Sequence, residues 1–436
     1  MPALTNEKLI KYLAITVTVV ACITRLSTAV ASIANGLALL LVLYLWHRNQ
    51  HSFNLSDEAK GYVKAYLVFI LLMLPSVFVS DKPLVSLKEL LNFLVWRYGT
   101  VIFIAIMAFI KRRDYLVNML TALLLTTTVD CLLTIPQSLL NMEKHIHGGR
   151  GWGLGGNSLY LSGILCMVLP AALVIVMDPA FEKRLKKAAS CAAAAITAGL
   201  VFNNSRSAWL TEVLVIPPTI WKYLKQQKKY LLGFVLVLAG IAGFMAAKPA
   251  YMARIRTIPA TFTNRSNDAR GLIWKHTVSF IQDRPVAGVG LGRFEEKYKA
   301  LRAEKTEAIK KQIQQAKAAA KKQPKQAKAI LSKVPKLDMP NLAHAHNNFL
   351  QVAAETGVIG LAGFVYFCGY VLVTGFKKYR NDHNPCDKLI FIVFLSNIVI
   401  MGMFDLTLTT SPNIRLMTFL IAVLLQMKTT QKLDDL

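Results

Sequence analysis

The run SLYLSGILCMVLPAALVIVMD, residues 158–178, decides the fold. It holds no charged residue before its final aspartate, and about 20 residues of helix cross the roughly 30 Å hydrocarbon core of a bilayer. Inside lipid every backbone polar group must be satisfied within the protein, which a helix does by itself. The run therefore predicts a membrane-spanning helix.

Similar runs recur along the whole chain. The 436 residues are 54% hydrophobic and only 17% charged, too apolar for an ordinary soluble domain. This predicts an all-α polytopic membrane protein with about 12 transmembrane helices. The predicted spans are 9–26, 28–46, 62–80, 90–110, 115–135, 158–178, 187–203, 207–222, 230–248, 349–375, 388–405 and 411–427. The chain then divides into helices 1–9 (1–248), one large loop (249–345) and helices 10–12 (346–436).

Basic clusters between the runs predict the orientation. They fall on one side, at residues 47–48, 111–113, 183–187, 222–229 and 377–380. By the positive-inside rule this side, with both termini, is cytoplasmic, so the large loop faces the periplasm of a bacterial inner membrane. The net charge of +27 could also suggest nucleic acid. Because the charge sits at helix ends, it fits membrane lipid headgroups instead, and we expect no nucleic-acid partner.

The large loop is expected to be mainly helical. Its stretch 295–333 is rich in Ala, Lys, Gln and Glu, all helix-favouring except where Pro324 breaks the run. A solvated helix with cationic faces is one interpretation. The other is a surface that binds anionic lipid headgroups or guides an anionic substrate.

Histidine pairs raise the question of a metal. His145 with His147, and His344 with His346, form His-x-His pairs of the kind that bind zinc. The six cysteines lie in apolar runs or a short basic loop, and no evident third ligand joins either pair. We therefore expect no metal, no cofactor and no disulfide framework in the loop.

The stretch HAHNNFLQVAAETGVIG, residues 344–360, places two histidines before an apolar run. On an ideal helix eleven residues turn through about 1100°, which would put Gly357 beneath His346, with Gly360 nearby. Such a stripe would be a smooth groove for a neighbouring helix or a lipid tail. A helix cap followed by small-residue packing explains the spacing as well, although imidazole is an apt base near neutral pH. Glu355 could face polar surroundings or orient His344.

These residues resemble a known family. His346 and Asn347, nine residues, then Gly357 and Gly360 look like the H[NSQ]x9Gxx[GTY] motif of bacterial O-antigen ligases, or lipopolysaccharide ligases. Their superfamily also contains O-antigen polymerases and protein oligosaccharyltransferases. The segment 206–210 resembles the family's Rx3L motif. About 12 spans with one large periplasmic loop before the histidine motif also resemble the family's GT-C-like glycosyltransferase architecture.

The resemblance implies an enzyme that transfers O-antigen polysaccharide from undecaprenyl diphosphate to a sugar hydroxyl of lipid A-core. His346 would act as general base in a metal-independent, inverting displacement. Arg206 would hold the leaving diphosphate, because a guanidinium binds phosphate oxygens bidentately. An arginine that merely orients its helix at the interface is the alternative for Arg206. O-antigen polymerase or protein O-oligosaccharyltransferase is the alternative activity.

The loop adds further diphosphate candidates. Arg270, with Trp274 one helical turn later, precedes a P-x-x-G-x-G segment at 285–290, which resembles the family's loops. Arg265 ranks slightly below Arg270. The stretch GVGLG at 288–292 looks like a nucleotide fingerprint, but nucleotides are scarce in the periplasm and we interpret it as a turn.

Possible substrate contacts are Asn347, Trp274, His344 and Arg150. Arg150 lies in a glycine-rich stretch, 136–157, whose amides could approach a phosphate. A flexible connector is the alternative interpretation of that stretch.

Some charged residues fall inside predicted spans, and two of them are candidates for an ion pair. Arg97 and Asp130 lie at similar depth, and we expect them to pair because an unpaired charge there is costly. Buried charges would also suit a transporter, but the chain has no visible internal repeat and its polar candidates gather at one face. A non-catalytic scaffold, indifferent to loss of His346, is the remaining class.

Overall fold

The computed structural model describes residues 5–49, 55–96, 99–144, 146–256, 269–322 and 339–434. These residues form helices joined by turns, with no strand in the ranges described. They divide into two compact units. Unit 1 comprises Met1–Ile70, Leu91–Thr257 and Val365–Leu436, and unit 2 comprises Leu71–Leu90 and Ile258–Phe364.

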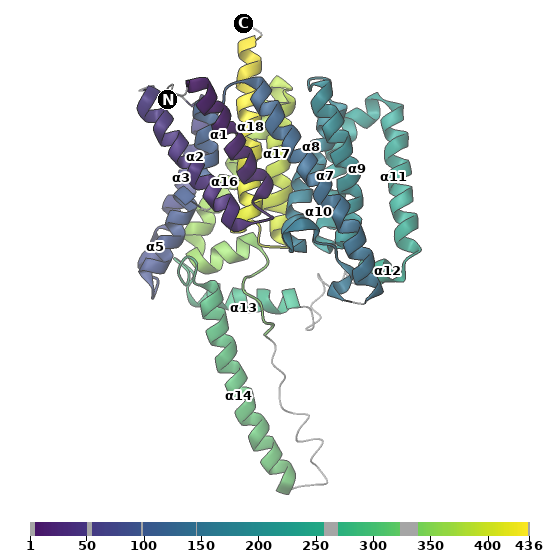
Figure 1. The fold of residues 1–436 in the computed structure, drawn as a ribbon. Coiled ribbons are helices and arrows are strands. Elements are labelled where there is room, and N and C mark those ends of the chain that lie inside the picture. The colour runs from purple at the N-terminus through teal and green to yellow at the C-terminus, as the bar shows by residue number, and fades with distance from the viewer. Residues whose placement is uncertain are drawn as a thin grey trace. The chain divides into compact units, whose positions relative to one another are not determined.

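Unit 1 is a bundle of helices that run side by side, with the start of α1 and the end of α18 at the same end (Figure 1). Its helices are α1 (Asn6–Ile23), α2 (Thr28–Asn49), α3 (Asp57–Met73), α6 (Thr100–Phe109), α7 (Arg113–Glu143), α8 (Ser158–Met177), α9 (Lys183–Asn203), α10 (Arg206–Gln226), α11 (Lys228–Ala246), α12 (Pro249–Arg256), the later part of α16 (Asn348–Asp382), α17 (Pro385–Phe394) and α18 (Ser411–Asp434). The uncharged run that begins at residue 158 forms α8. Its span is 78% buried, whereas that of α11, at the edge of the bundle, is 0% buried. A helix that is apolar on all sides belongs in such a central position.

The protein is an all-α polytopic membrane protein, as predicted. Within the described residues, eight helices are long and apolar enough to cross a membrane. They are Thr28–Arg48, Asp57–Phe78, Arg113–Glu143, Ser158–Met177, Lys183–Asn203, Lys228–Ala246, Asn348–Asp382 and Pro385–Met403. Three further predicted spans form α1, α10 and α18, which do not reach this standard of length and hydropathy.

The prediction of one continuous helix over 90–110 is wrong. A π-helical turn, η1 (Asn92–Trp96), follows α5 (Pro83–Leu91), and α6 begins only at Thr100 after Gly99 at φ 98°. A right-handed helix cannot continue through that conformation. A Cβ on Gly99 would lie 2.8 Å from Thr418 Cβ, so close packing against α18 favours glycine at the break.

Asp130 has a counter-charge that the sequence did not indicate. Its buried carboxylate pairs with Arg25, at the end of α1, whose side chain is only 3% exposed. Arg25 also donates to Trp152 O at 2.9 Å. Arg97 lies outside the described residues. The physical argument that a charge at this depth needs a counter-charge therefore holds, but the sequence did not identify Arg25 as its source.

Unit 2 contains α4 (Pro75–Phe78), α5, α13 (Ala269–Asp283), α14 (Phe294–Lys322) and the first part of α16. Its core joins α13, the start of α14, the segment before α16 and α16 itself. The buried members are Ile273, Phe280, Phe294, Tyr298, Met339, Ala345 and Ala354. The core therefore places Ala345, between the two histidines of the motif, in the packed interior.

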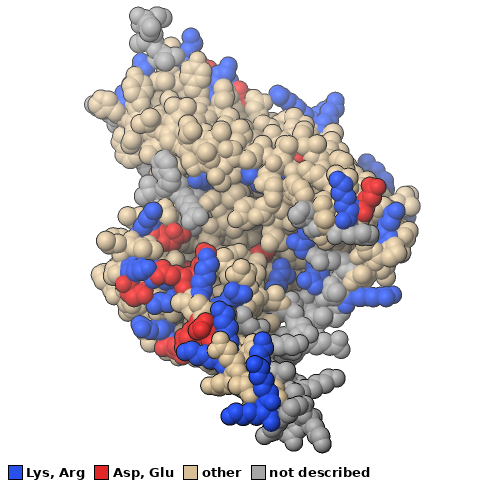
Figure 2. Space-filling model, turned by 60° about the horizontal axis from the view of Figure 1, so that its bottom comes forward, with Lys and Arg blue, Asp and Glu red and all other residues tan. Residues whose placement is uncertain are grey.

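The long basic helix predicted in the loop is present as α14. Acidic residues stop at Glu307, and from there to Lys322 all charged residues are lysines. Blue side chains accordingly continue to its far end while the red ones stay near its start (Figure 2). Pro324 lies outside the described residues.

Candidate functional site

His346 lies at the end of a loop rather than inside a helix. It has φ 50°, in the left-handed region, and α16 begins at Asn348. Asn347 caps that helix, because its Oδ1 accepts Leu350 N–H at 3.0 Å and its carbonyl accepts Gln351 N–H at 2.9 Å. The predicted helical stripe that placed Gly357 beneath His346 is therefore wrong, since helical periodicity does not extend to His346.

The second motif element, Gly357, breaks α16. It has φ 64° and ψ −165°, so the helical bonds across it cannot form. The loop 285–290 takes over the backbone groups that lose their partners. Val289 N–H and Gly290 N–H donate to Ala354 O (2.9 Å) and Glu355 O (3.0 Å), while Val358 N–H and Ile359 N–H donate to Pro285 O (2.8 Å) and Val286 O (3.4 Å). These four bonds replace helical partners at the break, as buried backbone requires.

The contact between the loop 285–290 and the break at Gly357, named the junction here, also fills the predicted groove. A Cβ on Gly357 would lie 2.2 Å from Val286 O, and one on Gly360 would lie 2.0 Å from Thr356 Oγ1. The loop backbone thus occupies the space that the glycine at 357 leaves. The P-x-x-G-x-G segment is a turn, as predicted, with left-handed glycines at 288, 290 and 292.

Residues 344–346, named the histidine tip here, are held in place through the backbone of Ala345. Its N–H donates to Gln351 Oε1 at 2.8 Å, and its C=O accepts Trp274 Nε1–H at 2.9 Å. Both imidazole rings are partly buried, with centroids 4.0 Å apart. The motif histidines therefore stand on a peptide anchored at both polar atoms.

Glu355 stands behind this anchor. Its Oε1 accepts Gln351 Nε2–H at 3.0 Å and Phe294 N–H at 3.2 Å. Phe294 is the first residue of α14, so the carboxylate lies at a helix N-terminus, where unsatisfied N–H groups favour negative charge. Sequence reasoning raised Glu355 as a residue that orients His344, and the contact to the tip runs through Gln351.

Arg270 and Trp274 lie one turn apart on α13 and so share one face of it. Since Trp274 reaches Ala345, this face is turned toward the histidine tip. Arg270 is partly buried. Arg265 lies outside the described residues.

An ion-pair cluster fixes the start of α14. Buried Arg293 donates to Asp81 at 3.2 Å and pairs with Glu296, while Lys297 contacts Asp81 at 2.7 Å and Lys82 contacts Glu296 at 2.6 Å. Hydrogen bonds from these cations lower the pKa of Asp81 and that of Glu296 to about 2. Both carboxylates thus stay ionised at neutral pH, and the ion pairs continue to hold the N-terminal turn (root) of α14.

Unit 1 carries the other predicted arginines. Arg206 begins α10 directly after Ser205, and Arg150 lies in the loop before α8. The two segments meet, because Gly151 N–H donates to Phe202 O at 3.0 Å and Asn204 Nδ2–H donates to Gly148 O at 2.9 Å. Both side chains are partly buried. Arg150 and Arg206 thus belong to one end of this bundle.

The glycine-rich loop is pinned rather than flexible. Side chains of α7 and α9 take up its backbone groups, and several of its amides are used in this way. Gln137 Oε1 accepts Trp152 N–H (3.1 Å) and Gly153 N–H (2.8 Å), Asp130 Oδ1 accepts Leu154 N–H (2.7 Å), Ser138 donates to Gly149 O (2.7 Å), Asn141 to Arg150 O (2.6 Å) and Asn203 to Gly151 O (3.1 Å). The amides of Trp152, Gly153 and Leu154 thus bind the protein itself rather than facing open space.

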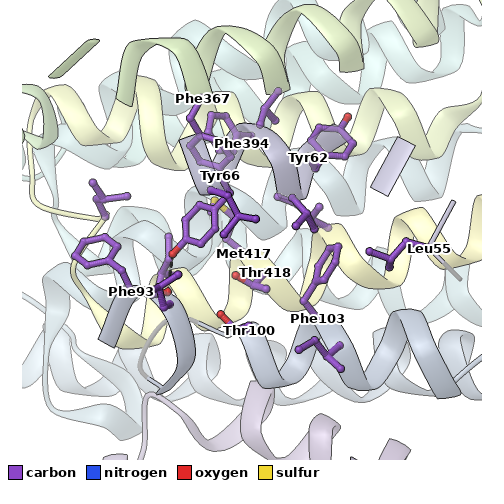
Figure 3. A pocket seen from close by; sticks show the side chains of 18 residues that line it. Leu55, Tyr62, Tyr66, Phe93, Thr100, Phe103, Phe367, Phe394, Met417 and Thr418 are labelled. Carbon is purple, nitrogen blue, oxygen red and sulfur yellow. Dashed lines mark hydrogen bonds between the residues drawn. The ribbon is translucent and has the colours of Figure 1, made fainter. Parts of the chain in front are cut away.

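An apolar cavity of about 280 Å³ opens between α3, η1, α6, α16, α17 and α18 of unit 1 (Figure 3). Aromatic rings of Tyr66, Phe103, Phe367 and Phe394 surround it, and Met417 and Thr418 of α18 close another side. The Tyr66 hydroxyl donates to Phe93 O at 2.7 Å, which leaves the ring face toward the cavity. The walls are thus mostly hydrocarbon, and three of the helices that form them, α3, α16 and α17, belong to segments long and apolar enough to cross a membrane.

The structure places His344, His346, Asn347, Trp274 and Arg270 in unit 2, and Arg150 and Arg206 in unit 1. Sequence reasoning missed Gln351 and the buried amides Asn141, Asn203 and Asn204. A signal for Gln351 was present, because Asn347, Gln351 and Glu355 are spaced four residues apart and so share one helix face. The buried asparagines lie at the ends of apolar runs, where a polar amide needs a partner.

Residues 191–365 match the sequence model of the O-antigen ligase family. The matched segment runs from α9 to α16 and contains both the Arg206 segment and the histidine motif. No curated protein matches the chain. This part of the protein is therefore O-antigen ligase-like, which supports a role as a glycosyltransferase-like enzyme.

Proposed function

From a chain whose residues 191–365 match the O-antigen ligase family, we propose an O-antigen ligase that attaches polysaccharide to lipid A-core. The donor is the glycan on undecaprenyl diphosphate, and the acceptor is a sugar hydroxyl of the core. The hydroxyl oxygen attacks the anomeric carbon while the bond from that carbon to the diphosphate oxygen breaks. His346 takes the hydroxyl proton, undecaprenyl diphosphate leaves, and a single displacement inverts the anomeric centre.

The observation that carries the proposal is the histidine tip. The backbone of His346 is in the left-handed region, and the preceding residue, Ala345, is anchored by Trp274 and Gln351. The surrounding structure therefore imposes a conformation that histidine by itself does not favour. Such conformations cost free energy and persist where neighbouring structure imposes them, which is typical of functional sites. A general base needs that fixed orientation toward the proton it removes.

The orientation predicted by the positive-inside rule completes the proposal. We place residues 1–248 and 346–436 in the inner membrane, residues 249–345 in the periplasm with the histidine tip, and both termini in the cytoplasm. The ends of unit 1 lie on the same side of the bundle, which supports a common location for the termini (Figure 1).

The deciding experiment supplies purified protein in liposomes with carrier-linked polysaccharide and three acceptors in turn. Glycan on lipid A-core supports the ligase. Glycan on a second carrier-linked chain instead would make the protein a polymerase, and glycan on a protein serine or threonine would make it an oligosaccharyltransferase. Either of these two results overturns the ligase assignment.

Arg206 and Arg270 are proposed to hold the diphosphate, with Arg265 and Arg150 in support. Replacing Arg206 or Arg270 by alanine is expected to lower kcat/KM for the donor by roughly 10- to 150-fold, because each removes charge-assisted hydrogen bonds worth about 1.5–3 kcal/mol. Lysine should restore only part of the loss, since it is not bidentate. The matched control is Arg284→Ala, an exposed arginine of unit 2. Equal losses in all three alanine variants would contradict a specific role.

The prenyl chain of the donor is proposed to occupy the aromatic cavity of unit 1. Val371 of α16 lines this cavity and is 2% exposed, whereas Val373 of the same helix is 51% exposed. Val371→Phe is expected to fill part of the cavity and raise the donor KM roughly tenfold, and Val373→Phe to leave it unchanged. Kinetics with donors of full and shortened prenyl length check this, and the shortened donor should lose less. An unchanged KM in Val371→Phe would place the chain elsewhere.

A further inference from the structure

Gln351 and Glu355 form a buried chain of hydrogen bonds that ends at the histidine tip. Gln351 is 5% exposed and Glu355 is 6% exposed. The carboxylate accepts from the Gln351 amide at 3.0 Å, and that amide's oxygen accepts from Ala345 N–H at 2.8 Å. Ala345 is fully buried and lies between His344 and His346. The chain therefore reaches the peptide on which both imidazoles stand.

The direction of this chain is fixed by its chemistry. Glu355 Oε1 accepts Phe294 N–H, so this oxygen also acts as an acceptor toward Gln351 and selects the NH2 side of the amide. The amide oxygen is thereby left to face Ala345 N–H. If the Gln351 amide were turned over, its oxygen would face the Glu355 carboxylate oxygen and its NH2 group would face Ala345 N–H. Both hydrogen bonds would then be lost. Glu355 thus determines which way Gln351 points, and Gln351 holds the tip.

Glu355 is itself anchored at two other places. Its Oε1 also accepts the first N–H of α14 at 3.2 Å, and its backbone carbonyl accepts Gly290 N–H at 3.0 Å. The loop 285–290 and the root of α14 therefore determine where the carboxylate lies. A residue held this firmly can orient a neighbour without moving itself.

We infer that Gln351 and Glu355 are positioning residues for the base His346, acting through the backbone of Ala345. This inference rests on the proposed function, because it assigns His346 the role of base. The two residues touch neither donor nor acceptor. They keep the imidazole at the angle and distance that proton removal requires, and a displacement of about 1 Å at such a site costs on the order of 10²-fold in rate.

The test compares four variants in liposomes. Gln351→Leu and Glu355→Leu remove the chain, whereas Glu355→Gln keeps an oxygen that accepts from Gln351 and from Phe294. Gln314→Leu is the matched control, because Gln314 is an exposed glutamine on α14. Two quantities are measured for each variant, namely amide hydrogen exchange of residues 344–347 and the separate values of kcat and donor KM.

The two leucine variants are expected to raise exchange at Ala345 at least about tenfold and to lower kcat by roughly 10- to 100-fold with donor KM unchanged. Glu355→Gln should restore most of both values, and Gln314→Leu should match the unmodified protein. Normal exchange and kcat in Gln351→Leu would overturn the inference. So would a Glu355→Gln protein as impaired as Glu355→Leu.

The exchange measurement separates this inference from the proposed function. If the protein proves to transfer no glycan, loss of the chain still loosens the tip and the positioning contact stands. If transfer occurs but the leucine variants lower kcat without any change in exchange at 344–347, the activity assignment survives and the positioning role does not. A raised donor KM with unchanged kcat would likewise reject positioning, because it would indicate loss of substrate binding.

Discussion

A His346→Ala protein is expected to lose glycan transfer, with kcat reduced by at least about 10²-fold and up to 10⁴-fold, the contribution of a general base. The side chain lies outside the helix that follows it, and both polar backbone atoms of the neighbouring Ala345 anchor the tip. The variant should therefore fold with an unchanged thermal midpoint. Initial rates with carrier-linked polysaccharide and lipid A-core measure the effect.

Two companion variants make the result specific. His346→Gln keeps a polar side chain of similar size but cannot accept the proton as a base, so it should be as inactive as alanine. His344→Ala removes the neighbouring ring, 4.0 Å away, and should retain more activity than either. A His346→Gln protein that works at a normal rate would remove the base from the mechanism and leave only a structural role for the motif.

Gly357→Ala is expected to destabilise unit 2 by about 3 kcal/mol or more, from left-handed strain of roughly 1–2 kcal/mol together with weakened backbone hydrogen bonds. The added Cβ would lie 2.2 Å from Val286 O and 2.3 Å from Val286 C. Backbone atoms cannot turn aside as a flexible side chain does, so the loop 285–290 must move away from the break. Thermal unfolding and exchange at residues 285–290 and 354–359 report the change.

Gly369→Ala provides the control within the same helix. A Cβ on Gly369 would meet nothing within 4 Å, so alanine there should raise helix stability by a few tenths to about 1 kcal/mol. If Gly357→Ala proved as harmless as Gly369→Ala, the kink would not be a property of the folded protein. The contrast between two glycines of α16 thus tests the junction directly.

Most helices could be predicted because lipid leaves the backbone few choices. An apolar run of about 20 residues must satisfy its own hydrogen bonds, so composition alone located α8 and most of its neighbours. The break at 92–99 could not be located in this way. It depends on the approach of α18 to Gly99, a contact between segments remote in the sequence.

The geometry of the histidine tip also could not be predicted from the local sequence. The residues of the motif were identified, but their geometry was derived from an ideal helix, and that assumption fails where a distant loop supplies the hydrogen bonds at Gly357. Likewise, the depth of Asp130 predicted a counter-charge, but depth alone pointed to Arg97 and did not identify Arg25. Periodicity describes a segment in isolation, whereas these features depend on partners elsewhere in the fold.

The junction at Gly357 also bears on the order in which the protein matures. It joins stretches about seventy residues apart, so Pro285 and Val286 leave the ribosome well before Val358 and Ile359 are made. Pro285 and Val286 can form these hydrogen bonds only after Val358 and Ile359 have been synthesised. The tip at His346 therefore gains its full support only once translation has passed residue 359. A nascent chain stopped short of that point would carry every histidine and arginine of the site without the framework that holds the tip.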